Sequence, residues 1–177
     1  MIIRKLLPGE GGRLQRHLLR LTHEDRTLRF MGCVANDVLA EYCADIDWAR
    51  TVVVGFFSAG VLRGAAELHV ATHQFSLTGE VAISVETAWQ HRGIATELLS
   101  RVIVIASNRW SRTLEMDSLH HNYRIRQLAR KFGARYRSTA GTSVAEIAVP
   151  APTYLSLWRE TIDDGFGWMS VWLGSTA

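Results

Sequence analysis

The segment WQHRGIATELL, residues 89–99, places a glycine immediately before a run of regularly spaced apolar residues. Before it, residues 80–86 contain several β-branched side chains, which favours a strand. After it, apolar side chains recur at helical spacing, which predicts an amphipathic helix with one face on a sheet. These side chains are Ile94, Leu98, Val102 and Ala106, with Ala95, Leu99 and Ile103 beside them. The segment is therefore predicted to be the turn between a strand and a helix.

This turn has the properties of an anion-binding site. The first N–H groups of a helix have no partner within the helix, and the helix dipole makes that end electropositive. Gly93 has no Cβ and Ala95 has only a methyl group, so a ligand could approach the backbone closely, and Arg92 adds a positive charge. The spacing is neither that of a Walker A motif nor that of a dinucleotide-binding motif. From these residues alone, a phosphate cradle and a tight turn without any ligand both remain open.

The composition is that of an ordinary globular protein. The 177 residues are 47% hydrophobic and 21% charged, which predicts one domain over residues 1–177. The net charge of +3 fits an anionic ligand, and no nucleic-acid-binding motif accompanies it. The start does not resemble a signal peptide, and charges interrupt the apolar windows well short of the roughly 20 residues of a membrane span. The two cysteines lack metal-ligand spacing, so no metal site is expected and a cytoplasmic location is favoured.

The remaining pattern predicts an α/β fold, or α+β, with a mixed sheet. Helical periodicity predicts helices at Leu14–Leu21, Val38–Ala44, Ile125–Phe132 and Tyr154–Ile162. Strands are predicted at Ile2–Leu7, Thr51–Ser58, Val61–Ala71, Thr113–Met116, Arg135–Thr139 and Ser143–Val149. Residues 22–32 look irregular.

The six residues from Gln90 to Ala95 match the Gln/Arg-x-x-Gly-x-Gly/Ala signature of the GNAT family of N-acetyltransferases, which the chain resembles. The flanking strand and helix lie where that family places them, and Asn122–Gly133 looks like its later helix beside the cofactor. Residues 23–30, 45–47 and 79–85 are similar to the bacterial protein-lysine acetyltransferase branch. The resemblance implies a single domain with a mixed, mostly antiparallel sheet, flanked by helices, whose strands splay apart at the cofactor site.

The resemblance also implies that acetyl-coenzyme A (acetyl-CoA) binds at the turn. The backbone N–H groups that would hold the pyrophosphate belong to Gln90, His91, Arg92, Gly93, Ile94, Ala95 and Thr96. The strand end that would pair with the pantetheine arm consists of Ile83, Ser84 and Val85. Asn122 is interpreted both as a helix N-cap and as a cofactor contact, two roles that can hold together.

The expected reaction is attack of an amine on the thioester carbonyl. A lysine amine is almost fully protonated at neutral pH, so a positioned base would accelerate this attack. In the lysine-acetylating branch a glutamate at the position of Glu80 is the general base, so the resemblance assigns that role to Glu80. Glu67, His69 and Glu86 are alternatives; without the resemblance, Glu80 would be interpreted as a solvated residue at the start of a strand. The N–H of Val85 is the candidate oxyanion donor.

One feature departs from many members of the family, and the interpretation of another stays open. Many members have a tyrosine, the acid for the leaving thiolate, at the position that Ala129 occupies here. Tyr123 would point elsewhere on the helix, so whether a general acid exists stays open. The basic residues between 124 and 137 are either a solvated face or a contact for the 3′-phosphate of coenzyme A or for an acidic partner.

The sequence does not name the acceptor. A protein lysine is the leading hypothesis, and the alternatives are a small amine (an antibiotic, a polyamine or an amino acid) or a catalytically silent CoA-binding sensor. The loops expected to select the acceptor, Thr22–Asn36 and Ala71–Thr78, contain no transferable motif. The apolar tail 166–173 is interpreted either as buried against the sheet or as a dimer contact. The protein is expected to be a monomer or homodimer, with neither nucleic acid nor membrane as a partner.

Overall fold

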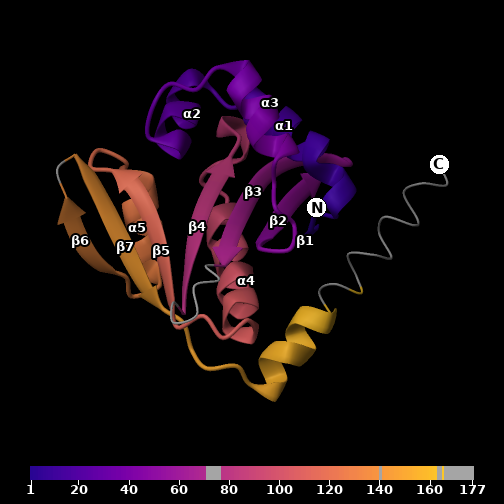
Figure 1. Ribbon diagram of the computed structural model, residues 1–177, viewed down its shortest axis with the longest axis vertical. Helices are drawn as coiled ribbons and strands as arrows, with labels where there is room; N and C mark the ends of the chain where they lie inside the picture. Colours follow the sequence, from indigo (N-terminus) through magenta and orange to yellow (C-terminus); the bar gives the residue numbers. More distant parts are fainter. Residues whose placement is uncertain (71–76, 140, 163–164, 166–177) are drawn as a thin grey trace.

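The computed structural model describes residues 1–70, 77–139, 141–162 and 165, and its centre is a mixed sheet (Figure 1). The seven strands lie in the order β1-β2-β3-β4-β5-β7-β6. Within this described sheet, β4 and β5 are parallel and the other neighbours are antiparallel. The predicted α/β fold with a mixed, mostly antiparallel sheet is therefore confirmed.

The strands are β1 (Ile2–Lys5), β2 (Thr51–Ser58), β3 (Val61–Val70), β4 (Thr78–Val85), β5 (Thr113–Leu119), β6 (Arg135–Thr139) and β7 (Thr142–Ala148). The α-helices are α1 (Gly11–Arg20), α2 (His23–Phe30), α3 (Asn36–Ala44), α4 (Ile94–Asn108) and α5 (Tyr123–Lys131). Two short 3-10 helices are η1 (Pro8–Glu10) and η2 (Thr87–Trp89). A further helix covers residues 154–162, as the sequence predicts.

Helices cover both faces of the β1–β4 half of the sheet. Helix α4 packs behind these strands in Figure 1, where Leu98 and Leu68 are fully buried together in one hydrophobic core. Helices α1 and α3 pack on the opposite face, where Leu14 and Leu39 meet Ala65 in a second core. Successive residues of β3 serve the two cores in turn because strand side chains alternate between faces.

Strands β4 and β5 separate soon after they begin. The described register pairs them from Thr78 with Thr113 to Glu80 with Glu115, which is less than half of either strand. Figure 1 shows the two strands close together at this end and diverging toward the other. The splayed strands that the resemblance implies are thus present. Strand β5 runs beyond the predicted Met116 to Leu119 because its later residues pair with β7.

The prediction that residues 22–32 are irregular is wrong, because most of them form helix α2. Thr22 caps this helix by accepting a hydrogen bond from the N–H of Asp25 at 3.1 Å. Met31 ends the helix with a left-handed φ of 58°. The helix has no fully buried residue, so the sequence lacks the regular apolar stripe that would have predicted it.

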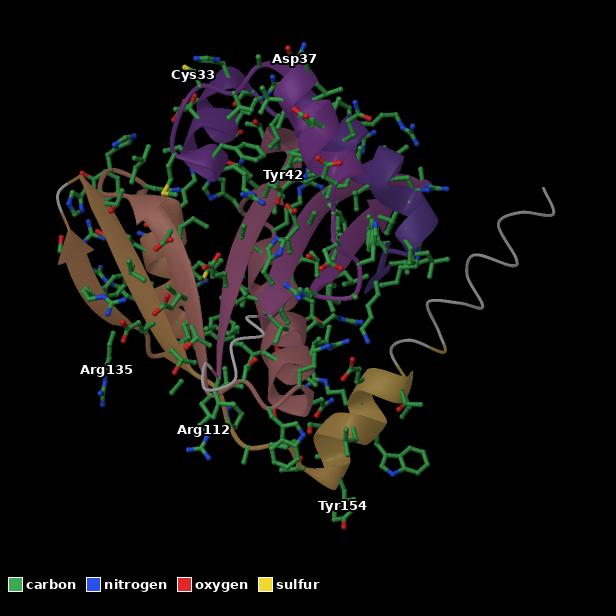
Figure 2. All side chains as sticks on the ribbon, viewed as in Figure 1. Cys33, Asp37, Tyr42, Arg112, Arg135 and Tyr154 are labelled. Carbon is green, nitrogen blue, oxygen red and sulfur yellow. The ribbon has the colours of Figure 1, made fainter. Side chains whose placement is uncertain are left out.

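The remaining observations concern the C-terminal helix, the tail, the cysteines and the helix lengths. Figure 2 shows Tyr154, the first residue of helix 154–162, pointing away from the sheet. The apolar tail 166–173 lies outside the described residues. Cys33 and Cys43 are free thiols. None of the described helices is long and apolar enough to cross a membrane, and the described residues contain no group of three or more His, Cys, Asp or Glu arranged to hold a metal ion.

A buried carboxylate attaches the α2–α3 layer to the sheet. Glu67 of β3 is fully buried and accepts hydrogen bonds from Arg29 of α2 and from the Tyr42 hydroxyl of α3, both at 2.7 Å. Figure 2 shows Tyr42 beneath α3, on the side of the sheet. Burial, followed by the nearby Glu67 charge, raises the pKa of the Tyr42 hydroxyl, so it remains a neutral donor.

We expect Arg29→Met to lower the free energy of unfolding by about 3–5 kcal/mol, because it leaves the Glu67 carboxylate buried without a counter-charge. The double variant Arg29→Met/Glu67→Leu should recover much of this loss, because it removes both charges while keeping the volume. The control is Arg50→Met, which breaks an exposed pair with Asp47 and should change stability by less than about 1 kcal/mol. Urea denaturation measures all three, and a double variant no more stable than Arg29→Met would contradict the assignment.

Candidate active site

A cavity of about 140 Å³ lies between the splayed parts of β4 and β5 and is closed by α2 and α5. We call it the central cavity. It is lined by Leu21, Asp25, Leu28, Arg29, Val81, Ala82, Ile83, Ser84, Val85, Gln90, Ala95, Met116, Asp117, Asn122, Arg124, Ile125 and Leu128. The predicted pantetheine residues Ile83, Ser84 and Val85 are therefore brought together with Asn122 around one cavity.

A second hollow of about 330 Å³ lies over the turn that precedes α4. We call it the turn hollow. It is lined by Val85, Gln90, His91, Gly93, Ile94, Ala95, Thr96, Arg124, Gln127, Leu128 and Lys131. Five of these residues, Val85, Gln90, Ala95, Arg124 and Leu128, also line the central cavity. The two spaces therefore adjoin each other, and we call them together the groove.

The backbone of the turn is open toward a ligand. His91 and Gly93 both have left-handed φ values, 59° and 78°, a conformation that costs a non-glycine residue about 1 kcal/mol or more. No side chain caps α4, whose first helical hydrogen bond runs from the Glu97 N–H to the Gly93 carbonyl at 3.0 Å. A Cβ on Gly93 would meet nothing within 4 Å. The helix start thus offers uncapped N–H groups at the turn hollow, with no side chain in between.

Asp25 of α2 bridges the groove. Its carboxylate accepts hydrogen bonds from Arg124 of α5 at 2.8 Å, from Gln90 at 3.2 Å and from Thr87 at 2.8 Å. The Gln90 side chain also donates to the carbonyl of Val85 at 2.9 Å, which fixes the end of β4 against the turn. Sequence reasoning missed this bridge, because Asp25 and Arg124 are 99 residues apart and no local pattern relates one to the other.

One face of α5 supplies positive charge to the turn hollow. Its lining residues follow the i, i+3, i+4, i+7 spacing of a single helix face and are Arg124, Gln127, Leu128 and Lys131. Arg126 and Arg130 instead lie about 6 Å from the centroid of the Tyr136 ring. The predicted basic run is therefore divided between a face at the turn hollow and a face turned away from it.

Other predicted residues differ in their placement. Asn122 caps α5 by accepting a hydrogen bond from the Ile125 N–H at 3.3 Å, and it also lines the central cavity. Arg92 is absent from the lining of both described spaces, and its guanidinium lies 4.9 Å from the Trp89 ring centroid. Ala129 is fully buried, and Tyr123 is 69% exposed and absent from the described lining.

Glu80 and His69 border a third space, open to the surface, of about 500 Å³. We call it the acidic hollow, because Asp45, Asp47 and Glu80 line it, and Arg50 is the one cation among its described lining residues. Glu80 is exposed, and its carboxylate makes no hydrogen bond or ion pair with the described chain. His69 is the register partner of Glu80 on β3, and its Nδ1 is hydrogen-bonded to the Thr51 hydroxyl.

The other two candidate bases are held by positive side chains. Glu67 is bound by Arg29 and Tyr42, as described above. Glu86 accepts hydrogen bonds from Arg20 and Arg63, each at 2.8 Å, and lies 3.3 Å from His17 Nδ1. Burial opposes ionisation of Glu86, but these hydrogen bonds outweigh it and lower its pKa to about 2. The oxygens of both carboxylates are therefore occupied by side chains of the protein, and the lowered pKa makes Glu86 a poor proton acceptor at neutral pH.

Comparison with known proteins identifies the architecture. Residues 17–134, about two thirds of the chain, match the model of the Acetyltransferase (GNAT) family. The chain belongs to this family. As in the family, the enzyme is an acyltransferase whose cofactor is acetyl-CoA.

Solved GNAT structures share this fold. The GNAT domain of S. lividans PAT is 19% identical with a TM-score of 0.71, over 82% of this chain and 89% of that one. The yncA protein of Salmonella typhimurium, solved with its cofactor acetyl-CoA, is 16% identical with a TM-score of 0.65, over 87% and 98%. A cAMP-binding acyltransferase from Mycobacterium smegmatis is 24% identical with a TM-score of 0.58, over 92% of this chain but 49% of the longer one.

The groove of this GNAT enzyme fits acetyl-CoA in shape and charge. The uncapped N–H groups beside Gly93 would hold the pyrophosphate, with Arg124 and Lys131 as nearby cations. The edge of β4 that has no β5 partner would receive the pantetheine arm. When bound, the cofactor supplies the activated acetyl group, and the protein supplies its orientation.

A matched pair of variants tests the cradle at the turn. Gly93 and Gly60 have φ values of 78° and 72°, and a Cβ on either would meet nothing within 4 Å. Alanine at either position should therefore lower the free energy of unfolding by a similar amount, about 1 kcal/mol. We expect Gly93→Ala alone to weaken coenzyme A binding, by about tenfold (~1.4 kcal/mol) or more, because its methyl group covers the N–H groups. Calorimetric titration giving equal affinities for both variants would contradict the cradle.

The depressed pKa of Glu86 predicts a pH-dependent contribution to stability. A carboxyl with a folded pKa of about 2 and an ordinary unfolded value of 4.5 stabilises the fold fully above pH 4.5 and loses this effect as pH falls toward 2. The contribution is at most roughly 3 kcal/mol, reduced by solvent around Arg20 and Arg63. We expect the stability difference between wild type and Glu86→Gln to shrink from pH 6 to pH 3 in urea titrations. A difference independent of pH would show that Glu86 is not ionised through these contacts.

Proposed function

We propose that this GNAT enzyme acetylates a lysine side chain of a protein, with Glu80 as the general base. The observation that supports this proposal best is the acidic hollow. It is open to the surface, its described lining has more carboxylates than cations, and the Glu80 carboxylate in it has no partner in the described chain. An open space suits a lysine presented by a macromolecule, because the rest of the protein acceptor can stay outside. The excess negative charge suits a cationic side chain.

The strand geometry relates this hollow to the cofactor groove. Glu80, Ala82 and Ser84 lie on one face of β4, because side chains two residues apart point the same way. Glu80 lines the acidic hollow, and Ala82 and Ser84 line the central cavity. At about 3.3 Å per residue, Glu80 and Ala82 are about 7 Å apart along the strand. Glu80 therefore lies on the same face of β4 as the wall of the central cavity, two residues before that wall begins.

The state of the carboxylates favours Glu80 among the candidate bases. A general base needs a free lone pair and contact with the acceptor. Glu67 and Glu86 use their oxygens to bind arginine side chains, whereas Glu80 has no such partner in the described chain. The similarity of residues 79–85 to the protein-lysine acetyltransferase branch points the same way.

We expect Glu80→Gln to lower kcat by about a hundredfold or more while changing the affinity for acetyl-CoA less than about twofold. The matched control is Glu115→Gln, because Glu115 is the register partner of Glu80 on β5 but pairs with Arg137 and lines none of the described spaces. Steady-state kinetics on a lysine-containing protein and calorimetry with acetyl-CoA give the two readouts. Undiminished turnover in Glu80→Gln would remove Glu80 from the role of base.

The nature of the acceptor is tested separately with the wild-type enzyme. Folded basic proteins, lysine peptides, polyamines, free amino acids and aminoglycosides are compared by kcat/KM with acetyl-CoA. The proposal expects proteins or peptides to be preferred by at least tenfold. A preference for a free amine would replace the protein acceptor with a small molecule, and binding of acetyl-CoA without acetylation of any acceptor would favour a silent sensor.

A further inference from the structure

A hydrogen-bonded chain of serine, histidine and glutamate ends at the wall of the central cavity. Ser84 Oγ lies 2.9 Å from Nε2 of His17, and Nδ1 of His17 lies 3.3 Å from a carboxylate oxygen of Glu86. His17, on α1, is fully buried, whereas Ser84 lines the cavity. None of these contacts belongs to the turn that binds the cofactor.

The direction of each hydrogen bond follows from the charge of Glu86. This carboxylate is bound by Arg20 and Arg63 and is ionised, so it can only accept a hydrogen bond. Nδ1 of the neutral His17 ring must therefore bear the proton, and Nε2 has the lone pair. The Ser84 hydroxyl then donates to Nε2, and its oxygen has only lone pairs to offer the cavity. Such an oxygen accepts an N–H group and can pass a proton to the ring behind it.

We propose that Ser84 Oγ receives an N–H of the acceptor amine and relays its proton to His17, which Glu86 orients. This inference rests on the proposed acetyl transfer to an amine and adds a second proton acceptor to Glu80. Ser84 is the catalytic residue of the relay because it touches the amine, and His17 and Glu86 act through it as positioning residues.

The proton balance of the reaction leaves room for a second acceptor beside Glu80. An ammonium nitrogen has three protons and the product amide has one, so two protons must leave. Glu80 removes the first, which gives the neutral amine. The electron pair of this amine forms the C–N bond, and the second proton then moves to Ser84 Oγ while the Ser84 proton moves to Nε2 of His17. The C–S bond breaks, and its electron pair leaves with the coenzyme A thiolate. The protonated His17 beside the Glu86 anion then gives its proton to the thiolate or to solvent.

The charges around His17 allow the ring to accept the second proton of the nitrogen more readily than the first. The charged groups that face the ring are Glu86 directly, with Arg20 of α1 and Arg63 of β3 behind that carboxylate. The two guanidinium groups partly cancel the attraction of Glu86 for a protonated ring. Transfer of a proton from a free ammonium ion to such a ring is unfavourable. After the nitrogen has bonded to the carbonyl carbon, it is a far stronger acid and the transfer becomes favourable.

A cluster of side chains between the central cavity and the acidic hollow separates Ser84 and His17 from Glu80. The Arg29–Glu67–Tyr42 cluster lies between the two spaces, since Arg29 lines the central cavity and Tyr42 lines the acidic hollow. Glu80 is absent from the lining of the central cavity among the described residues. A nitrogen that has moved past this cluster is therefore beside Ser84 and not beside Glu80.

The test uses the full-length enzyme and the substitutions Ser84→Ala, Ser84→Thr and His17→Gln. We expect Ser84→Ala to lower kcat about ten- to a hundredfold with less than a twofold change in acetyl-CoA affinity, and Ser84→Thr to recover most of the rate. His17→Gln keeps a hydrogen-bond acceptor for Ser84 but cannot take up a proton. It should therefore lower kcat about as far as Ser84→Ala does and change the shape of the pH–kcat profile, which a merely structural role would not do.

A readout independent of activity is the ¹⁵N spectrum of the histidine rings. The proposal expects His17 to be the Nδ1–H tautomer, with an Nε2 signal that shifts in Ser84→Ala. The matched controls are Ser143→Ala and His120→Gln, which break another serine–histidine hydrogen bond, of 2.6 Å, away from the described cavities. These controls should leave kcat and its pH profile unchanged.

The outcomes separate this inference from the proposed function. Wild-type kcat and pH profile in Ser84→Ala, or an Nε2–H tautomer of His17, would overturn the relay while leaving acetyl transfer intact. Failure of the wild-type enzyme to acetylate any amine would instead overturn the proposed function. Because His17 is fully buried, His17→Gln is first checked by circular dichroism; if it does not fold, the two Ser84 variants and the tautomer decide the question.

Discussion

The early end of the pairing between β4 and β5 is the constraint on which the groove depends. Two parallel neighbouring strands are joined here by the crossover helix α4, and parallel pairing normally continues along both strands. In this chain the pairing stops after Glu80 and Glu115, while β5 stays paired with β7 along its other edge as far as Leu119. The free edge of β4 then faces a cavity, and the same strand leads directly into the turn with the uncapped helix. One separation of two strands thus places a backbone edge and a helix N-terminus in the same groove.

The alternation of side chains along β4 divides two tasks between its faces. Val81, Ile83 and Val85 point toward α4 and belong to the hydrophobic core, which holds the strand in place although β5 has left it. Glu80 and Ser84 point to the other face, where α2 borders the central cavity and the end of α3 borders the acidic hollow. A shift of register by one residue would exchange the two sets and would bury the Glu80 carboxylate in the core. The packing of the core therefore fixes which side chains are available for chemistry.

The local parts of this design could be predicted from the sequence, and the long-range parts could not. The strand–turn–helix unit around Gly93 is visible because periodicity and turn residues act over a few positions. The cap at Asn122 is visible for the same reason. By contrast, Ser84 and His17 are 67 residues apart, and Asp25 meets Arg124 from another helix. Such polar pairs have no period in the sequence, and they form only because the sheet brings α1, α2 and α5 to one site. Helix α2 was missed because its stability depends on a cap and on these contacts more than on an apolar stripe.

The arginines of the chain decide which carboxylates remain available as bases. The mild positive charge of the sequence gives no hint of this, because net charge does not say which charges are paired. Arg29 is paired with Glu67, and Arg20 and Arg63 are paired with Glu86, so each of these carboxylates is held in place and orients a neighbouring group. Glu80 has no such arginine among the described residues and is open to solvent. An enzyme that moves protons from an ammonium ion needs one carboxylate left free and others held fixed. The arginines on α1, α2 and β3 around strand β4 meet both needs at once.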